Sequence, residues 1–413
     1  VGPLAGGSPA ILQLLLAVAA ERPALAEEGG AVGLYAAAVT GALVHAGLAG
    51  GQAGVEAARR ALEVVGFEAH RLRFGAPTAA AGGIAGGAAA KGGGGFREVD
   101  LAGALSSEDS AAFSRLAEAA AAGRLPLLQR RGVGGAAAES YRFVHTSVQE
   151  YLFAVHMARL IGGTACGPSR EASSPSRSPN SGGGASAGAV PGVPSLRTLL
   201  SEAWWSRPLE LLAEGYPEQC AVLLRRGAEA WEAVRGPVEV TPLYLAVERC
   251  LQGIVAELLE QGHAVGGVQH RSRHIYGSLE ETPLSCAAGR GGVAVTELLL
   301  GRRAEVNGFQ AAQLTPGGER RERTPLFSAV ERGHLAVTHL LLLANAEPGG
   351  VQLCEEGGAA GSRARTRTCL DAAGTEDLRR LLLDAGAAPA GRPGTSAGRP
   401  GTSAGRPGTS AGR

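Results

Sequence analysis

Three clusters of arginine have a residue type and spacing suited to binding chemistry. A guanidinium group carries a permanent charge and a planar fork of N–H donors, which matches carboxylates and phosphates. The clusters lie in the C-terminal half, at Arg271 and Arg273, then Arg320, Arg321 and Arg323, then Arg363, Arg365 and Arg367. They predict a basic strip for an acidic partner. Solvated loop charge is the simpler explanation, since four acidic residues neutralise part of it: Glu280, Glu281, Glu319 and Glu322.

Few other residues have a spacing that suggests chemistry. His270 and His274 lie four residues apart, but two histidines without further ligands are more simply loop residues than a metal site. No H-E-x-x-H motif and no G-x-x-x-x-G-K-[ST] phosphate-binding loop occurs, and Lys91 lies in a glycine–alanine run. We therefore expect no enzyme, no metal site and no bound cofactor in this chain.

Composition and charge narrow the class of partner. The 413 residues include 39 basic and 38 acidic ones, and the net charge of +1 gives no overall attraction for nucleic acid or a membrane. Aromatic residues make up 4 %, too few for the stacking that binds single-stranded nucleic acid. The apolar run at residues 10–20 is too short to span a bilayer. Six cysteines form no C-x-x-C pair, and three lie in apolar helical stretches, which predicts a reducing, cytoplasmic location.

A repeated motif surrounds the arginine clusters. Thr-Pro-Leu begins at Thr241, Thr282 and Thr324, and Thr-Cys-Leu begins at Thr368, so the copies start 41, 42 and 44 residues apart. An earlier copy begins at Pro208. Leucine-rich helical patterns follow each opening. Because one such unit cannot bury its apolar face alone, the repetition predicts a stack of helical units.

Each motif residue has a physical reason. The threonine hydroxyl can cap the first helix, and proline suits the first helical position, where its missing N–H costs nothing. Small alanines let two helices approach closely, and Gly333 suits the turn between helices. The alanines are Ala246, Ala287 and Ala329. Leucine pairs supply the buried layer between units, at Leu258–Leu259, Leu298–Leu299 and Leu340–Leu341.

This pattern resembles the ankyrin-repeat family over roughly residues 205–390, because the T-P-L opening, the alanine, the G-H-L turn and the L-L-L helix recur in register. The resemblance implies about five repeats, the first and last degenerate, that bind another protein. The copies are longer than the family repeat of about 33 residues. The excess falls before each T-P-L, where ankyrin fingers project. We therefore expect long finger loops whose arginines lie near one another on one edge.

The N-terminal region carries a second resemblance. A short strand from Tyr141 to Val144 is expected to precede a helix, and an apolar helix to open at Leu34–Tyr35. The element F-x-H-x-S-x-Q-E-Y/F resembles the end of the winged-helix domain in NACHT-type STAND ATPases. The resemblance covers roughly residues 7–161 and corresponds to the part of those proteins that follows the nucleotide-binding core. The matching residues are Phe143, His145, Ser147, Gln149, Glu150 and Tyr151.

That resemblance implies that His145 reaches the phosphates of bound ADP and that Pro9 touches the adenine. A half-buried histidine at a helix start is the alternative for His145. The phosphate-binding loop and the magnesium ligands are missing, so ADP or ATP binding is expected only in a longer parent protein. The chain begins with Val1, which favours a fragment or a processed product.

The sequence thus predicts a mainly α fold in four segments. A helical and winged-helix region covers 1–161, a disordered linker 162–195, an ankyrin-repeat α-solenoid 196–390, and a disordered GRPGTSA tail 391–413. The predicted function is a protein–protein interaction scaffold, the recognition arm of a STAND-type signalling protein. The alternatives are a fragment of an ATP/ADP-dependent switch whose core lies upstream, and a stand-alone ankyrin adaptor.

Overall fold

Two compact units make up the chain. The first comprises residues 1–271 and 297–304, and the second comprises residues 272–296 and 305–413. The computed structural model is mainly helical, as predicted. It describes residues 30–48, 52–74, 96–101, 103–131, 140–165, 190, 192–233, 240–274, 277–307, 311–314, 320–356 and 363–388. No helix within those residues is both long enough and apolar enough to cross a bilayer. Pro9, most of the predicted linker and the predicted tail lie outside the described residues.

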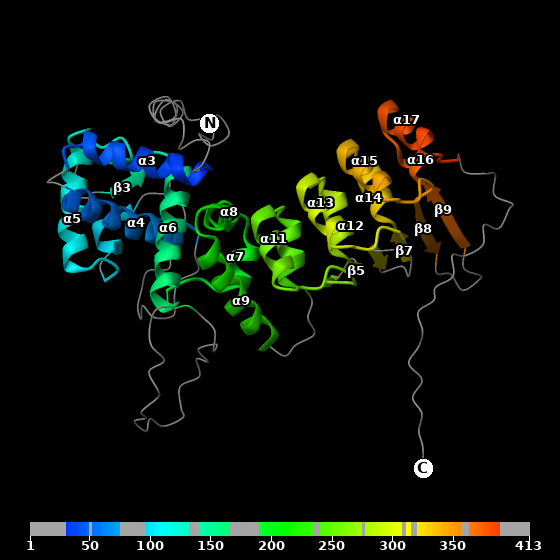
Figure 1. Ribbon diagram of the computed structural model, residues 1–413, viewed down its shortest axis with the longest axis horizontal. Coiled ribbons are helices and arrows are strands. Elements are labelled where there is room, and N and C mark those ends of the chain that lie inside the picture. The colour runs from blue at the N-terminus through cyan, green and yellow to red at the C-terminus, as the bar shows by residue number, and fades with distance from the viewer. Residues whose placement is uncertain are drawn as a thin grey trace, which may run out of the picture. The chain divides into compact units, whose positions relative to one another are not determined.

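Four helices form the N-terminal part of the first unit (Figure 1). They are α3 (Gly30–His45), α4 (Gln52–Phe74), α5 (Ser107–Ala121) and α6 (Thr146–Ala165). α4 and α6 approach closely at Gly66, where an added Cβ would lie 2.6 Å from the Cβ of Leu152. At the next residue of each helix, the rings of Phe67 and Phe153 stack at 4.7 Å. Small residues thus set the helix spacing, and aromatic rings fill the remaining space.

A three-stranded antiparallel sheet with the order β1-β3-β2 belongs to the same part. The strands are β1 (Phe96–Arg97), β2 (Leu128–Arg131) and β3 (Ser140–Phe143), and the 3-10 helix η3 (Glu98–Leu101) follows β1. Phe96, Tyr141 and Phe143 gather with Phe113 of α5, and their ring centroids lie 5.8 to 6.5 Å apart. The predicted strand from Tyr141 to Val144 is confirmed as β3, which begins one residue earlier, and the predicted helix after it is confirmed as α6.

Helices α3 and α6 pack directly on helices that follow the predicted linker. These are α8 (Ser206–Gly215) and α9 (Pro217–Ala233), and they are preceded by α7 (Leu196–Ser201) and the 3-10 helix η4 (Ala203–Trp205). The Glu214 carboxylate accepts a hydrogen bond of 2.5 Å from the Ala31 N–H at the start of α3. The Trp205 ring lies 5.0 Å from the Phe153 ring of α6. The first unit therefore includes residues on both sides of that linker, and the predicted boundaries at 161 and 196 stay a prediction.

Five helix pairs follow the motif copies. After α8 and α9 come α10 (Pro242–Glu248) with α11 (Gln252–Glu260), α12 (Pro283–Arg290) with α13 (Val293–Gly301), α14 (Pro325–Glu331) with α15 (Leu335–Leu343), and α16 (Cys369–Ala372) with α17 (Glu376–Asp384). α10 and α11 belong to the first unit, α12 and α14 to α17 belong to the second, and α13 begins in the second and ends in the first.

The motif threonines cap the first helix of the last four pairs, as predicted, whereas α8 begins after Trp205 without a side-chain cap. Each hydroxyl accepts a hydrogen bond of 3.1 to 3.3 Å from the backbone N–H three residues later, at Thr241, Thr282, Thr324 and Thr368. Proline follows the first three of these caps at the start of the helix. Ala246, Ala287 and Ala329 are fully buried, which confirms that small residues line the helix contacts.

The G-H-L turn joins two helix pairs within the second unit. Gly333 has a φ of +80°, as its predicted place in the turn requires. The His334 ring nitrogen Nε2 lies 3.1 Å from the carbonyl oxygen of Gly289, at the end of α12. The same ring packs against Gly291, where an added Cβ would lie 2.6 Å from the imidazole. One turn residue thus ties α14 and α15 to α12.

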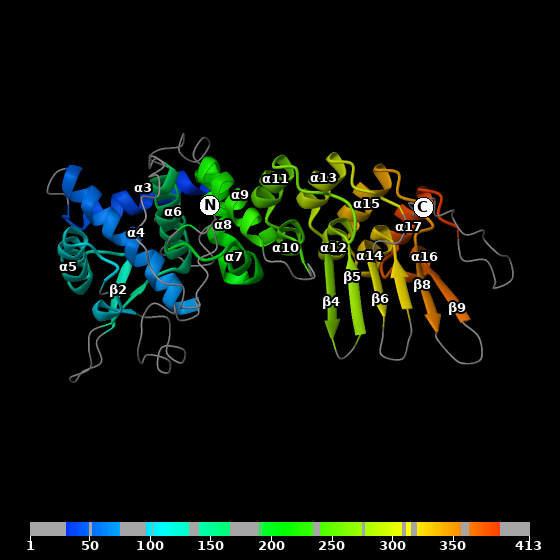
Figure 2. The same ribbon diagram turned by 90° about the horizontal axis from the view of Figure 1, so that it is seen from below.

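The finger segments form strands, and the prediction that they are loops is wrong. The strands are β4 (His270–His274), β5 (Gly277–Glu281), β6 (Ala311–Leu314), β7 (Arg320–Arg323), β8 (Val351–Glu356) and β9 (Arg363–Thr368). They lie side by side in chain order as one six-stranded sheet, here called the finger sheet (Figure 2). Each pair from β5 to β9 is antiparallel. Pairing between successive fingers satisfies backbone groups that a loop would leave to water.

Candidate functional site

The finger sheet brings four of the predicted arginines onto one face. Arg321 of β7 and Arg365 of β9 are both in register with Cys354 of β8. Arg323 and Arg367 are both in register with Gln352, which lies two residues before Cys354 on β8. Residues directly opposite one another, and residues two apart along a strand, share a face of the sheet. We call this side of the sheet the arginine face, with an outer row of Arg321 and Arg365 and an inner row of Arg323 and Arg367.

Strand geometry sets the spacing on the arginine face. Neighbouring strands lie about 4.8 Å apart, so the two arginines of a row are roughly 10 Å apart at the backbone. The two rows are roughly 7 Å apart, which is the repeat of alternate residues in an extended chain. Arg321, Arg365 and Arg367 are exposed, and Arg323 is half-buried. The face therefore presents positive charge with the periodicity of an extended peptide.

Helix α14 contacts the inner row. The Glu331 carboxylate, at the last residue of that helix, lies 3.3 Å from Nη1 of Arg323 and 3.2 Å from Nη1 of Arg367. The Arg367 guanidinium also lies over the buried Phe327 ring, 5.8 Å from its centroid. A carboxylate at a helix C-terminus is disfavoured by the helix dipole, so the two guanidinium groups compensate it.

The other predicted arginines are Arg271, Arg273, Arg320 and Arg363. Arg320 lies on the opposite side of β7, where its Nη2 makes an ion pair of 2.5 Å with Oε1 of Glu322. Arg271 is exposed on β4. Arg273 and Arg363 lie on β4 and β9, but their side chains fall outside the described part of the chain.

His145 lies at the start of α6, half-buried. Its Nδ1 accepts a hydrogen bond of 3.1 Å from the Ser147 N–H and lies 2.7 Å from the Ser147 hydroxyl oxygen. The Ser147 hydroxyl also contacts Tyr35 of α3, whose pKa is raised by burial. His145 thus caps α6 through one ring nitrogen, which is the geometry of a helix-start histidine. Its role toward ADP stays a prediction.

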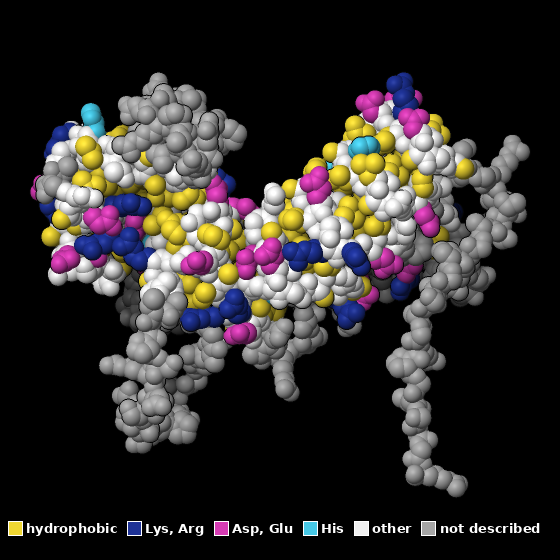
Figure 3. Space-filling model, viewed as in Figure 1, with side chains coloured by type: hydrophobic (Ala, Val, Ile, Leu, Met, Phe, Trp, Pro, Cys, Tyr) yellow, Lys and Arg dark blue, Asp and Glu magenta, His cyan; other side chains and the backbone are white. Residues whose placement is uncertain are grey.

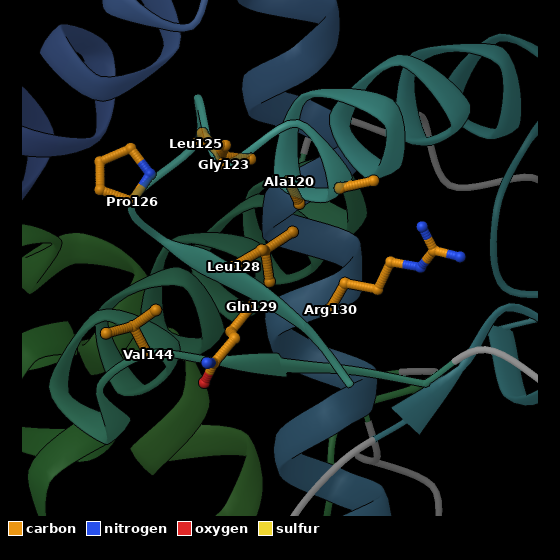
Figure 4. Close-up of a pocket in the computed structure, with 9 residues that line it drawn as sticks. Ala120, Gly123, Leu125, Pro126, Leu128, Gln129, Arg130 and Val144 are labelled. Atoms are coloured by element: carbon orange, nitrogen blue, oxygen red, sulfur yellow. The ribbon is translucent and has the colours of Figure 1, made fainter. Parts of the chain in front are cut away.

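An open hollow of about 560 Å³ lies between the end of α5 and strand β2. Its lining is mostly aliphatic, with Leu125, Leu128 and Val144 along the wall (Figure 4). Arg130 supplies a charge on the side away from Val144. Val144 lines the hollow, whereas the neighbouring His145 does not.

A buried ion cluster in the first unit escaped the sequence analysis. Glu63 of α4 is 1 % exposed, and its carboxylate lies 3.3 Å from Nε of Arg59 and 2.7 Å from Nη2 of Arg159 on α6. Burial raises the pKa of Glu63 despite the two guanidinium groups. The cluster links α4 to α6 through a buried carboxylate and two partly exposed arginines, which is a structural role. A glutamate on the apolar face of a helix, four residues after an arginine, is the signal that could have revealed it.

Three of the cysteines are buried as small apolar residues, as predicted, whereas Cys250 is exposed. Cys220, Cys286 and Cys369 are buried thiols. Burial raises the pKa of Cys220 and of Cys369 to about 12, so neither carries a thiolate near neutral pH. No three histidine, cysteine, aspartate or glutamate side chains of the described residues gather as metal ligands would.

Comparison with protein-family models and with curated proteins finds no match to this chain.

Proposed function

We propose that this protein binds another protein through the arginine face, and that it holds an acidic, extended segment of that partner. The observation that carries the proposal is the register that places Arg321, Arg323, Arg365 and Arg367 on one side of the finger sheet. Carboxylates on alternate residues of an extended segment repeat at roughly the 7 Å that separates the two rows. Guanidinium groups bind carboxylates through paired, charge-assisted hydrogen bonds, so the match is chemical as well as geometric.

The architecture that we propose for this function is an ankyrin-repeat solenoid. The threonine caps, the buried alanines and the bond from His334 to Gly289 support it. For the N-terminal part we propose a winged-helix domain of the STAND type, which the small sheet and the helix-start position of His145 support. The chain would then be a non-enzymatic recognition arm of a cytoplasmic signalling scaffold, with no cofactor of its own.

A charge-reversal experiment tests the proposal. Binding of a fluorescein-labelled oligoglutamate peptide is followed by fluorescence anisotropy for the wild type and for Arg321→Glu/Arg365→Glu. We expect the double variant to bind at least about tenfold more weakly, because two attractive charges become repulsive. Binding to the wild type should also weaken as salt screens the exposed charges.

The matched control is Arg320→Glu, which makes one reversal on the opposite face of the same strand. It should change the affinity less than about twofold. Equal losses in the single and double variants would show that only overall charge matters. No binding to the wild type at low salt would overturn the proposal outright.

A further inference from the structure

Strand β9 is one of the two end strands of the finger sheet within the described residues, the other being β4. The strand order places β9 last, after β8. The exposed edge of a sheet presents unpaired N–H and C=O groups that can accept another strand. Arg365, Thr366 and Arg367 are all exposed.

The ladder identifies which backbone groups point outward from β9. The Cys369 N–H donates to the Gly350 carbonyl at 2.9 Å, which makes that pair a hydrogen-bonded one. Hydrogen-bonded pairs alternate in an antiparallel ladder, so Arg365 and Arg367 face β8 with their backbone groups, while Ala364 and Thr366 turn theirs outward. The next outward N–H, that of Thr368, donates to the Asp371 carboxylate at 2.9 Å. The stretch of β9 with outward backbone groups available for pairing therefore ends before Thr368.

Resting on the proposed function, we infer that the acidic segment docks as an added strand along β9, with its acidic residues at alternate positions. The backbone of the segment pairs with the outward groups of Ala364 and Thr366. Its acidic side chains then lie opposite Arg365 and Arg367 on the arginine face. Those positions are non-hydrogen-bonded pairs, where opposite side chains come closest.

Charge selects this occupant over a second copy of the chain. Both end strands of the finger sheet are basic, with the sequences HRSRH in β4 and RARTRT in β9. Edge-to-edge pairing of two copies would place like charges opposite one another, which destabilises a ladder. An acidic strand turns the same charges into attraction.

Two peptides of identical composition separate strand pairing from simple attraction between charges. One alternates glutamate and threonine, and the other carries all its glutamates in one block before the threonines. Both have the same net charge, so a purely electrostatic surface binds them about equally. We expect the alternating peptide to bind the full chain about tenfold more tightly, measured by anisotropy. Methylating the backbone nitrogens that face β9 should abolish that advantage, because each methyl group removes a donor.

A variant of the protein tests the same strand pairing by removing a donor from β9. Thr366→Pro removes an outward N–H, and an edge strand tolerates proline where the N–H faces solvent. The control Thr366→Ala alters the side chain but keeps the N–H. We expect the proline variant to bind the alternating peptide about as weakly as the block peptide, and the alanine variant to resemble the wild type. Amide exchange in α14 and α16 verifies that both variants keep the fold.

The outcomes separate the two proposals. Equal affinity for both peptides, with loss only in Arg321→Glu/Arg365→Glu, overturns strand addition and leaves the acidic-partner proposal standing. No affinity for either peptide overturns both. An advantage of the alternating peptide that survives in Thr366→Pro and after N-methylation also overturns strand addition.

Discussion

Arginine serves opposite purposes in the two units. In the first unit, Arg59 and Arg159 converge on one carboxylate, Glu63, that is 1 % exposed. In the second, four arginines share a sheet face, and the one glutamate that contacts two of them, Glu331, is 30 % exposed. A buried carboxylate needs its partners because water cannot replace them. An exposed one can exchange its partners, which is what a binding surface requires.

Exposed apolar side chains occur on both units, with Val44 53 % and Leu72 45 % exposed on the first. On the second unit, hydrophobic side chains reach the surface over α15 (Figure 3), and Leu343 is 67 % and Leu335 44 % exposed. Single exposed leucines are common and carry no argument by themselves. The contrast between the arginines of the two units is therefore the more informative one. The substitutions below test it.

The largest effect is expected from removing the guanidinium groups around the buried carboxylate. Arg59→Met/Arg159→Met should lower the free energy of unfolding by about 3–5 kcal/mol at neutral pH, because an uncompensated charge stays buried. Urea denaturation measures the loss. The matched control, Arg323→Met/Arg367→Met, removes two arginines from Glu331 and should cost less than about 1 kcal/mol. Equal losses would erase the contrast between the units.

The pH dependence of that loss has a definite sign. The pKa of Glu63 is raised in the folded state, so its contribution is fully present below the unfolded value of about 4.3 and is lost as pH rises through the folded pKa. Removing the arginines raises that pKa further. The deficit of the double variant should therefore shrink as the solution is acidified and Glu63 takes up a proton. A deficit that grows in acid would contradict the assignment.

A smaller effect is expected from filling the helix contact one turn beyond Glu63. Gly66→Ala places a methyl group 2.6 Å from the Cβ of Leu152, and it should destabilise the fold by about 1–3 kcal/mol. Gly41→Ala, also within a helix, meets no atom within 4 Å and should stabilise it by about 0.5–1 kcal/mol. Thermal unfolding of the two variants gives the comparison. Shifts of the same sign would refute the close packing of α4 on α6.

Removing the carboxylate that contacts Arg323 and Arg367 should change the peptide affinity more than the stability of the fold. Glu331→Gln removes the charge that occupies Arg323 and Arg367, so the affinity for the oligoglutamate peptide should rise about threefold. Glu322→Gln, which removes a carboxylate from the opposite face, is the control and should leave the affinity unchanged. Weaker binding of Glu331→Gln would mean that this carboxylate positions the inner row instead of competing with the partner.

The smallest effect is expected at the capping box of α16. Thr368 and Asp371 exchange hydrogen bonds there, and Asp371→Ala should cost about 0.5–1 kcal/mol. Those bonds lower the pKa of Asp371, so its contribution is present above the unfolded pKa and is lost as pH falls through the folded one. Amide exchange at Thr368 reports the change locally. Asp384→Ala, at the exposed end of α17, should leave that amide unaffected.

Local features of the fold were predictable from the sequence. The caps at Thr241, Thr282 and Thr324 and the turn at Gly333 follow from residues within a few positions of one another. The finger sheet was not predictable in this way, because two of its pairings, β5 with β6 and β7 with β8, join segments from different repeats. Strands with the sequences RRER and RARTRT show no apolar face that would mark them.

The candidate site was predictable as a set of residues but not as a surface. Arg320 and Arg321 are adjacent in the sequence, yet only the register shows that they lie on opposite faces of β7. The Glu63 cluster was missed because Arg159 lies on another helix, far away in the chain. The sequence left two interpretations of His145, a phosphate contact and a half-buried histidine at a helix start. The structure places His145 half-buried at the start of α6.

The continuous ladder from β5 to β9 also has a mechanical consequence. Repeat stacks are joined only by nearest-neighbour contacts, so their units can fray one at a time from either end. Backbone pairing of β5 with β6 and of β7 with β8 adds a second seam between successive helix pairs. Detaching the last pair then requires opening a strand ladder as well as a helix contact, so the second unit should resist end-fraying and unfold as a single cooperative block.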